Sequence, residues 1–129
     1  MNQDTTQTLD QRRAAFAREK IRHLETSGRD YGHYVSYASA LPATIVMNGL
    51  GQALATQLAK AKGKQEHPRR LLYDHVADWL SRQMEELHVP EKELPRVVDL
   101  LMEHNQSVYV RAQAEAMAYL NWLKQFARA

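Results

Sequence analysis

The pattern of apolar and polar positions along the chain is helical nearly throughout. Apolar residues recur at intervals of three and four, and the strict alternation typical of strands is absent. The clearest case is residues 106–127, whose apolar positions are Tyr109, Ala112, Ala116, Tyr119, Leu123 and Phe126. This pattern predicts an all-α fold, in which residues 1–129 form a single compact bundle of five to six helices and residues 1–7 are disordered.

Local signals predict where the helices begin and end. Thr8 and Gln11 fit a capping box at the start of the first helix, and Ser27-Gly28 ends it. A second helical stretch is interrupted or kinked at Leu41-Pro42, because proline lacks an N–H and disfavours helix in the residue before it. The expected later helices cover residues 31–48, 50–61, about 68–87, a short segment from 95, and 106–127.

The distribution of charge is more informative than the net charge of +2. Residues 11–22 hold five basic residues and one acidic residue, and residues 60–70 repeat this composition. Residues 74–103 reverse the sign, with eight acidic and three basic residues, whereas residues 31–59 carry no Asp, Glu, Lys or Arg. Charge asymmetry of this kind is expected where different surfaces meet different partners.

The charge-free segment 31–59 supports two interpretations, which are compatible with each other. In the first, it is the centre of the bundle, where small residues such as Ala38 and Gly49 allow helices to approach closely. In the second, part of it contacts another subunit, because charged residues are depleted at the centre of interfaces. Gly49-Leu50-Gly51 is expected to be a turn or a site of close packing rather than a dinucleotide fingerprint, because position 54 is Leu and no strand precedes it.

The two basic clusters are candidates for contact with a nucleic-acid backbone. Arg and Lys bind phosphates whatever the base sequence, through release of counterions. The alternative is that both clusters are ordinary solvated helix faces. For the RNA-binding interpretation to hold, the clusters should form one continuous positive surface, and its residues would be Arg12, Arg13, Arg18, Arg22, Lys60, Lys62, Lys64, Arg69 and Arg70. Trp79 and Trp122 lie on or beside apolar stripes and are expected in the core.

No pattern in the sequence predicts an enzyme. There is no cysteine, no pair of histidines has the i, i+4 spacing of metal ligands, and no serine has a glycine elbow. Asp74, His75 and Asp78 could hold a divalent ion on one helix face, but a solvated face is the simpler interpretation. We therefore expect no catalytic residue, metal, cofactor or small-molecule substrate. The absence of a signal peptide, of a long apolar run and of cysteine predicts a cytoplasmic protein without a membrane partner.

Three segments resemble a known family. They are QRRAAFA at residues 11–17, Leu41-Pro42 followed by NGLGQALA at residues 48–55, and AEAMAYLNWLKQFA at residues 114–127. In this order, they are similar to the small, all-helical subunit of the type III-B CRISPR (Cmr) complexes, which are RNA-guided and target RNA. The middle segment is the most specific, whereas residues 62–70 and 88–105 match weakly.

The resemblance implies a non-catalytic, structural role in antiviral defence. Such subunits stack head to tail as an inner filament beside the other Cmr subunits, and their basic faces contact the backbone of guide and target RNA, while base pairing supplies specificity. Head-to-tail stacking requires two different complementary surfaces. Together with the charge distribution, this predicts a subunit interface at Asn48, Gln52, Asp74, Asp78, Glu85 and Glu86. The alternative function is a helical protein–protein adaptor without nucleic-acid contact.

Overall fold

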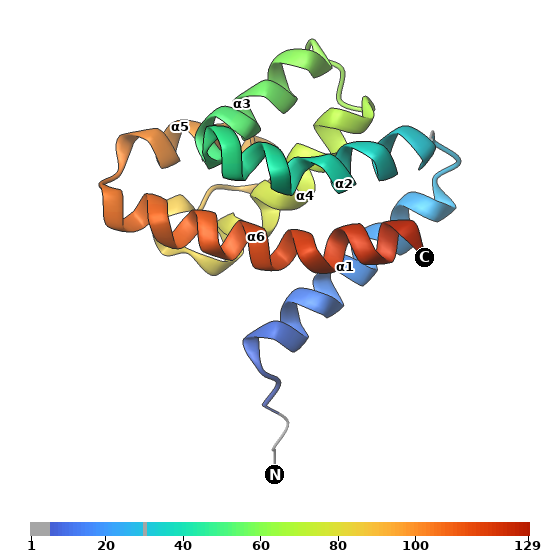
Figure 1. Cartoon of the computed structure of the whole chain (residues 1–129), viewed down its shortest axis with the longest axis horizontal. Coiled ribbons are helices and arrows are strands. Elements are labelled where there is room, and N and C mark those ends of the chain that lie inside the picture. The colour runs from blue at the N-terminus through green and yellow to red at the C-terminus, as the bar shows by residue number, and fades with distance from the viewer. Residues whose placement is uncertain (1–5, 30) are drawn as a thin grey trace.

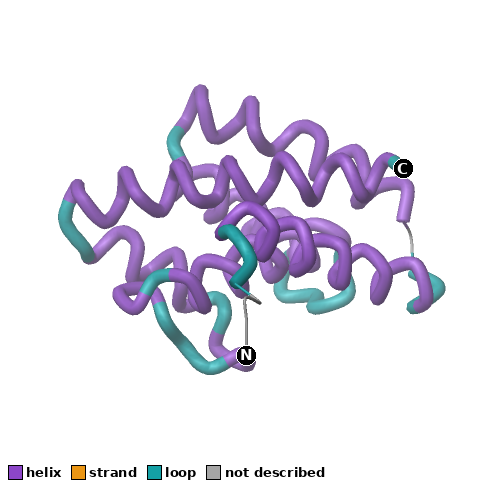
Figure 2. Tube along the Cα trace, turned by 90° about the horizontal axis from the view of Figure 1, so that it is seen from below, coloured by secondary structure: helices purple, strands orange, loops and turns teal. Residues whose placement is uncertain are grey.

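The computed structural model describes residues 6–29 and 31–129, and in this part of the chain it contains six α-helices and no strand. Helix α6, the longest helix, packs along α1 and α2, while α3 packs against α4 (Figures 1 and 2). The prediction of an all-α bundle of five to six helices is confirmed. The helices are α1 (Leu9–Thr26), α2 (Tyr31–Asn48), α3 (Leu50–Ala61), α4 (Pro68–Gln83), α5 (Arg96–Glu103) and α6 (Gln106–Arg128).

All six helices contribute to one hydrophobic core. At the core, the rings of Trp79 and Tyr119 stack with centroids 5.2 Å apart, and Phe16 packs against both of them. The predicted core position of Trp79 is confirmed, whereas Trp122 is only partly buried. The single-domain organisation stays a prediction, supported by this shared core. Of the segment expected to be disordered, residues 1–5 lie outside the described residues, and Thr6 and Gln7 precede α1 in non-helical backbone.

The helix ends follow local chemistry. The Thr8 hydroxyl accepts from the N–H of Gln11 at 3.0 Å, and the Gln11 side chain accepts from the N–H of Thr8 at 2.8 Å, which confirms the capping box. Gly49 joins α2 to α3 with φ +86°, a conformation that favours glycine. A Cβ at Gly49 would also lie 2.9 Å from the hydroxyl of Tyr109, so this glycine serves both the turn and close packing, as predicted.

Helix α2 covers residues 31–48 as predicted, and the interruption that was one of the two expectations at Pro42 is absent, with buried residues on both sides of the proline. One expected helix boundary was wrong. Helix α4 ends at Gln83 rather than near Leu87. The Ser81 hydroxyl donates to the carbonyl of Val89 and accepts from its N–H, at 3.1 and 2.9 Å, so the chain folds back on α4. Two short 3₁₀ turns, Glu85–Leu87 and Glu91–Glu93, then lead to α5.

Candidate nucleic-acid interface

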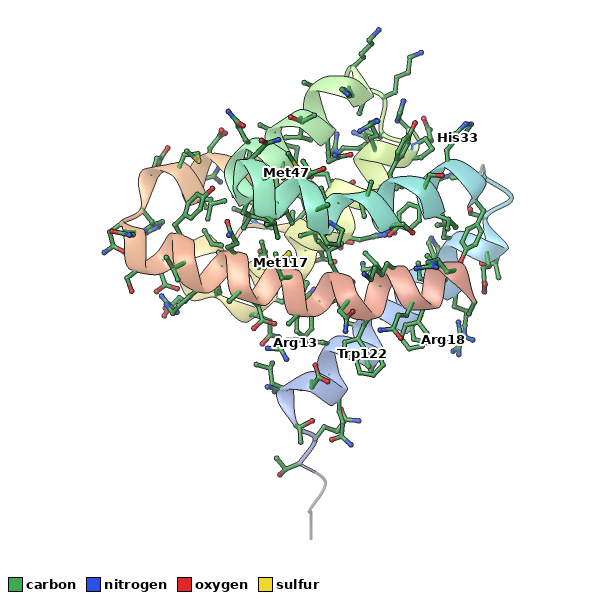
Figure 3. All side chains as sticks on the ribbon, in the orientation of Figure 1. Arg13, Arg18, His33, Met47, Met117 and Trp122 are labelled. Atoms are coloured by element: carbon green, nitrogen blue, oxygen red, sulfur yellow. The ribbon has the colours of Figure 1, made fainter. Side chains whose placement is uncertain are left out.

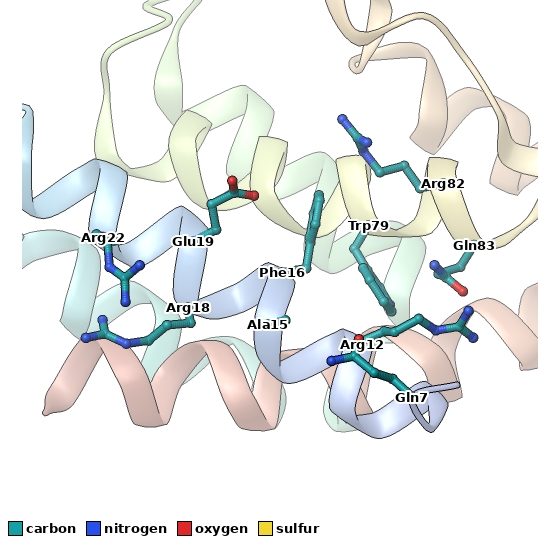
Figure 4. Close-up of a pocket in the computed structure, with 10 residues that line it drawn as sticks. All are labelled: Gln7, Arg12, Ala15, Phe16, Arg18, Glu19, Arg22, Trp79, Arg82 and Gln83. Carbon is teal, nitrogen blue, oxygen red and sulfur yellow. The ribbon is translucent and has the colours of Figure 1, made fainter. Parts of the chain in front are cut away.

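The first basic cluster lines a shallow hollow of about 620 Å³ on the outer side of α1. Among its lining residues, Figure 4 shows Arg12 on one side of Phe16, Arg18 and Arg22 on the other side, and Arg82 on α4. Glu19 is the one carboxylate among the residues that line the hollow. Four guanidinium groups against one carboxylate make this hollow an attractive site for an anion.

Aromatic rings hold several of these cations in place. The guanidinium of Arg18 lies over the ring of Phe126 at 5.6 Å, and Arg82 lies over Phe16 at 5.2 Å. Arg12 and Arg22 are exposed and make no ion pair within the described part of the chain. Sequence reasoning missed Arg82, because the residue belongs to the acidic region 74–103 and reaches the hollow only through the packing of α4 beside α1.

Arg13 does not belong to this hollow, although its neighbour Arg12 does. Its guanidinium makes two hydrogen bonds with the Glu115 carboxylate, at 2.6 and 2.9 Å, and a third with Asp10 at 3.1 Å. Glu115 also accepts from the indole N–H of Trp79 at 2.8 Å. The expectation that Arg13 binds RNA is therefore corrected, because its charge is already neutralised between α1 and α6.

This network also sets the ionisation of Glu115. Hydrogen bonds from Arg13 lower the pKa of the Glu115 carboxyl, partial burial raises it, and the bond from Trp79 lowers it, so that the pKa lies below its ordinary value. A carboxylate held ionised in this way keeps Arg13 fixed against α6. Figure 3 shows Arg13 on the α1 side of the molecule, close to Trp122, whose indole N–H donates to Asp10 at 3.0 Å.

The second basic cluster lies near the α3–α4 loop, and its residues differ in how exposed they are. Lys60, Lys62 and Lys64 are exposed at the end of α3 and in the following loop, which Figure 1 places at the opposite end of the view from the start of α1. Arg69 is half-buried, with its guanidinium 4.0 Å from the centroid of the Tyr37 ring. Arg70 bonds to Asp74 at 2.8 Å and retains little exposure. Three of the five predicted cations in this cluster are therefore freely exposed.

The two basic clusters do not form the continuous positive surface that was expected. Between them lies a cleft in which basic and acidic side chains alternate. The ionisable residues of this cleft are Lys20, Arg70, Lys92, Asp74, Asp78, Glu91 and His75. The structure therefore divides the predicted positive surface into an α1 hollow and a separate group of cations near the α3–α4 loop. RNA binding by one surface that joins both clusters is contradicted, and the α1 hollow alone remains the candidate for an RNA contact.

The predicted subunit-interface residues have different environments. Asn48, Gln52 and Glu85 are exposed. Glu86 pairs with Arg111 of α6, and Asp74 pairs with Arg70, so both are already partly neutralised. The remaining member, Asp78, is only 4% exposed.

Asp78 is an internal charge rather than a surface one, which corrects its assignment to a subunit interface. Its carboxylate bonds to Lys20 and Arg82, each at 2.9 Å, and so joins α1 to α4. Burial raises the pKa of Asp78, but the bonds from these two cations outweigh burial and leave the pKa below its ordinary value. The charge is tolerated inside the bundle because it is paired twice.

The expected solvated face at Asp74, His75 and Asp78 is also wrong. The hydroxyl of Tyr34 and Nδ1 of His75 lie 2.6 Å apart, and burial lowers the pKa of His75 to about 3, which keeps the ring neutral. Within residues 6–29 and 31–129, no three His, Asp or Glu side chains are grouped so that they could hold a metal ion. No helix in the same ranges is both long and apolar enough to cross a membrane.

The charge-free segment shows the first of its two predicted roles. The inner face of α2 packs into the centre of the bundle through Tyr34, Ala38, Leu41 and Ile45. Its outer face is uncharged as well, and Val46 and Met47 are 72% and 81% exposed. Contact of this outer face with another subunit stays a prediction.

Comparison with known proteins places the chain in a family. The family described as CRISPR-associated protein (Cas_Cmr5) matches residues 9–129. The CRISPR system Cmr subunit Cmr5 of Thermus thermophilus is 33% identical over 117 residues, which cover 90% of each chain. The X-ray crystal structure of a CRISPR-associated Cmr5 family protein, also from Thermus thermophilus, superimposes with a TM-score of 0.74 at 26% identity, over 95% of this chain and 96% of that one. The resemblance carried by the three sequence segments is thereby confirmed, and the chain belongs to the Cas_Cmr5 family of small CRISPR-associated Cmr subunits.

Proposed function

We propose that this protein is a non-catalytic structural subunit of a cytoplasmic type III-B CRISPR (Cmr) effector complex that targets RNA. In this role, it stacks head to tail with copies of itself beside the other Cmr subunits, and it holds the backbone of guide and target RNA on a basic face. Membership of the Cas_Cmr5 family supports the place in a Cmr complex. The observation that carries the RNA contact is the α1 hollow, which is lined by four arginines and one carboxylate.

The hollow is suited to phosphate groups rather than to bases. Arg18 and Arg82 are held against aromatic rings, so these two cations lose little conformational freedom when they bind an anion. Recognition of single-stranded bases needs exposed aromatic faces for stacking. Here the ring of Phe16 is already covered by Lys20 and Arg82, at 4.9 and 5.2 Å, and Trp79 is 3% exposed. Binding that depends on the backbone and not on sequence fits a subunit whose complex is guided by base pairing.

Head-to-tail stacking needs two unlike surfaces, and the chain offers a pair of opposite charge. Residues 85–103 form an acidic segment that contains the two 3₁₀ turns and α5. Its carboxylates at Glu85, Glu91, Asp99 and Glu103 are exposed and make no ion pair within the described residues. An acidic surface of this kind is complementary to the basic surfaces of a neighbouring copy.

Charge reversal of the two unpaired arginines tests the RNA contact. Each phosphate contact contributes about −0.7 to −0.9 to the slope of log affinity against log salt concentration. Arg12→Glu combined with Arg22→Glu should therefore weaken binding of target RNA by the assembled complex, whatever the target sequence, and make the slope less steep by about 1.5. The measurement is a salt titration of RNA affinity.

The matched control reverses Arg29 and Arg128, which are also exposed but do not line the hollow. Its net charge changes by the same amount, so it should retain the wild-type slope. Equal losses of RNA affinity in both variants would show that the effect depends on net charge alone. An unchanged affinity and slope in the hollow variant would contradict the RNA contact.

The alternative function, a helical adaptor that contacts only proteins, has one observation in its favour. The outer face of α2 is uncharged and exposes Val46 and Met47, as expected of a surface that another protein covers. A pull-down of the partner subunits with and without nuclease treatment separates the two functions. The adaptor would capture its partners equally well after RNA is destroyed and would show no salt-dependent RNA binding.

A further inference from the structure

A second hollow, of about 320 Å³, lies between α2, α3 and the first turn of α4. Two cations, Lys60 and Arg69, stand in it among uncharged polar side chains, and no carboxylate lines it. The uncharged polar groups come from Thr44 and Asn48 of α2 and from Thr56 and Gln57 of α3. The hollow is therefore a small positive site that is separate from the α1 hollow.

The guanidinium of Arg69, in the wall of this hollow, is held in place before any ligand binds. Tyr37 supports the guanidinium of Arg69 from one face at 4.0 Å, and Arg69 donates one hydrogen bond to Gln57 Oε1 at 3.3 Å. Gln57 is 5% exposed, and its amide nitrogen has no hydrogen-bond partner within the described part of the chain. Guanidinium and amide N–H groups thus remain available to one acceptor, and a fixed guanidinium is well suited to a carboxylate.

The surroundings favour a protein side chain over a nucleic acid. The volume is sufficient for one or two side chains, and Tyr37, Ala40 and Leu41 of α2 contribute apolar surface to the lining. Residues 31–65 contain no acidic residue, and residues 31–59 contain no charged residue of either sign. A charge-free, partly apolar surface around a few fixed donors is typical of the centre of a protein–protein interface.

The outer face of α5 carries the complementary groups. Asp99 and Glu103 are one helical turn apart, both are exposed, and neither makes an ion pair within the described residues. Met102, which is 63% exposed, lies beside them. This face presents two free carboxylates and one apolar side chain, which match the cations and the apolar part of the lining of the hollow.

One copy of the chain cannot bring the two surfaces together. Met102 packs beside Gly51, at the start of α3, so that a Cβ on this glycine would lie 2.5 Å from the sulfur. Lys60 is nine residues further along the same helix, which corresponds to about 14 Å. Asn48, at the near end of the hollow, is only three residues from Gly51, but Lys60 at its far end is out of reach of α5 of the same copy, so the contact with Lys60 forms between different copies.

We propose that the α2–α3–α4 hollow receives the carboxylates of Asp99 and Glu103 from a second copy of this chain. The inference rests on the proposed head-to-tail stacking and names its two surfaces. The contact joins unlike surfaces, so each copy keeps one hollow and one α5 face free for further neighbours. The α1 hollow takes no part in it and stays available to RNA.

The absence of cysteine from the chain makes a cross-linking test specific. One variant carries Lys60→Cys and a second carries Glu103→Cys, and both are incorporated together into the assembled complex with its RNA. A short bis-maleimide should join the two variants into a covalent dimer. The control pairs Lys60→Cys with Glu25→Cys, an exposed position on α1 that should give no dimer. No dimer from the first pair, or equal yields from both pairs, would overturn the proposal.

A charge swap distinguishes this inference from the broader proposed function. Lys60→Glu alone, or Asp99→Lys with Glu103→Lys, should weaken association between copies at least tenfold in sedimentation experiments, and a mixture of the two variants should restore it. If copies stack but neither variant weakens their association, the two surfaces are misassigned, while the proposed head-to-tail stacking is not contradicted. If Lys60→Glu lowers RNA affinity and leaves the copy number unchanged, the hollow is an RNA site. A complex that holds a single copy refutes both the stacking and this contact.

Discussion

The two basic clusters have the same composition in the sequence but different roles in the fold. The cluster on α1 contains arginines that are fixed in place: Arg13 is locked to Glu115, while Arg18 rests on the ring of Phe126. The cluster at residues 60–70 divides between exposed lysines at the end of α3 and two half-buried arginines at the start of α4. Similar charge counts therefore produce different mixtures of fixed and free cations in the two clusters.

The difference between the two clusters shows that carboxylates distant in the sequence decide which cations remain free. The partner of Arg13 lies 102 positions away in the sequence, and the partner of Lys20 lies 58 positions away. Neither is visible when the cluster is examined along the chain. The packing of α1 against α6 and α4 therefore distinguishes a binding cation from a structural one.

The largest effect is expected at Glu115. Glu115→Ala removes the partner of the Trp79 indole N–H and leaves Arg13, at a partly buried site, with its bond to Asp10 alone. The free energy of unfolding should fall by about 2–3 kcal/mol, since losing one member of a buried pair exposes the desolvation cost of the other. Urea denaturation followed by circular dichroism measures this. Arg12→Ala, one position before Arg13, should change stability by less than about 0.5 kcal/mol. Equal losses in the two variants would contradict the division between fixed and free arginines.

The same network predicts how stability depends on pH. In the folded protein, the pKa of Glu115 lies below its ordinary value of 4.5, because Arg13 and Trp79 stabilise the carboxylate. The unfolded chain therefore binds the proton more readily, so the contribution of Glu115 is complete above about pH 4.5 and is lost as the pH falls through the folded pKa. Glu115→Gln should make the loss of stability below this pH less steep, as measured by unfolding at a series of pH values.

Asp74 provides a control, because its effect on the pH dependence of stability has the opposite sign. Burial raises its pKa above the ordinary value of 3.8, despite the bond from Arg70, so the folded protein holds this proton more tightly than the unfolded chain does. The wild-type protein loses this contribution as the pH rises through the raised pKa. Asp74→Asn should therefore make the rise of stability from acid to neutral pH steeper. A change in the same direction for both variants would show that the two carboxyl groups are misassigned.

Much of the helical architecture could be predicted from the sequence, because it depends on local patterns. The Thr8–Gln11 capping box and the glycine turn at Gly49 are encoded within a few residues. The early end of α4 could not be predicted, because it depends on the Ser81–Val89 bonds across a reversal of the chain.

Some residues of the candidate site could likewise be predicted from the sequence, and others could not. The exposed Arg12 and Arg22 could be identified from the face of α1 that they occupy. Arg13 and Asp78 could not be distinguished from surface charges, since their partners belong to other helices. Arg82 was missed for the same reason, because only the packing of α4 beside α1 brings it to the hollow.

A smaller effect is expected in the second cluster. Arg69→Ala removes the guanidinium from the face of Tyr37 and the hydrogen bond to the buried Gln57. The free energy of unfolding should fall by about 1–2 kcal/mol, from the loss of a cation–π contact and of one hydrogen bond at a partly buried site. Lys64→Ala, in the exposed loop, should leave it within about 0.5 kcal/mol of the wild type. Thermal or urea unfolding compares the two, and an effect at Lys64 as large as that at Arg69 would contradict the division within this cluster.

The smallest effect is expected at Arg82, and it tests whether the hollow extends beyond α1. Arg82 and Arg96 have similar exposure, 54% and 56%, and each pairs with a carboxylate on its own stretch of chain, but the partner of Arg82 is the buried Asp78. Arg96→Gln removes an exposed ion pair and should cost less than about 1 kcal/mol, whereas Arg82→Gln should cost more, because it leaves Asp78 with its bond from Lys20 alone. Only Arg82 lines the hollow, so only Arg82→Gln should weaken RNA binding by the complex, by a few fold, and make the salt slope less steep by about 0.7 to 0.9. Equal RNA binding by the two variants would confine the phosphate contacts to α1 and leave Arg82 as the partner of Asp78 alone.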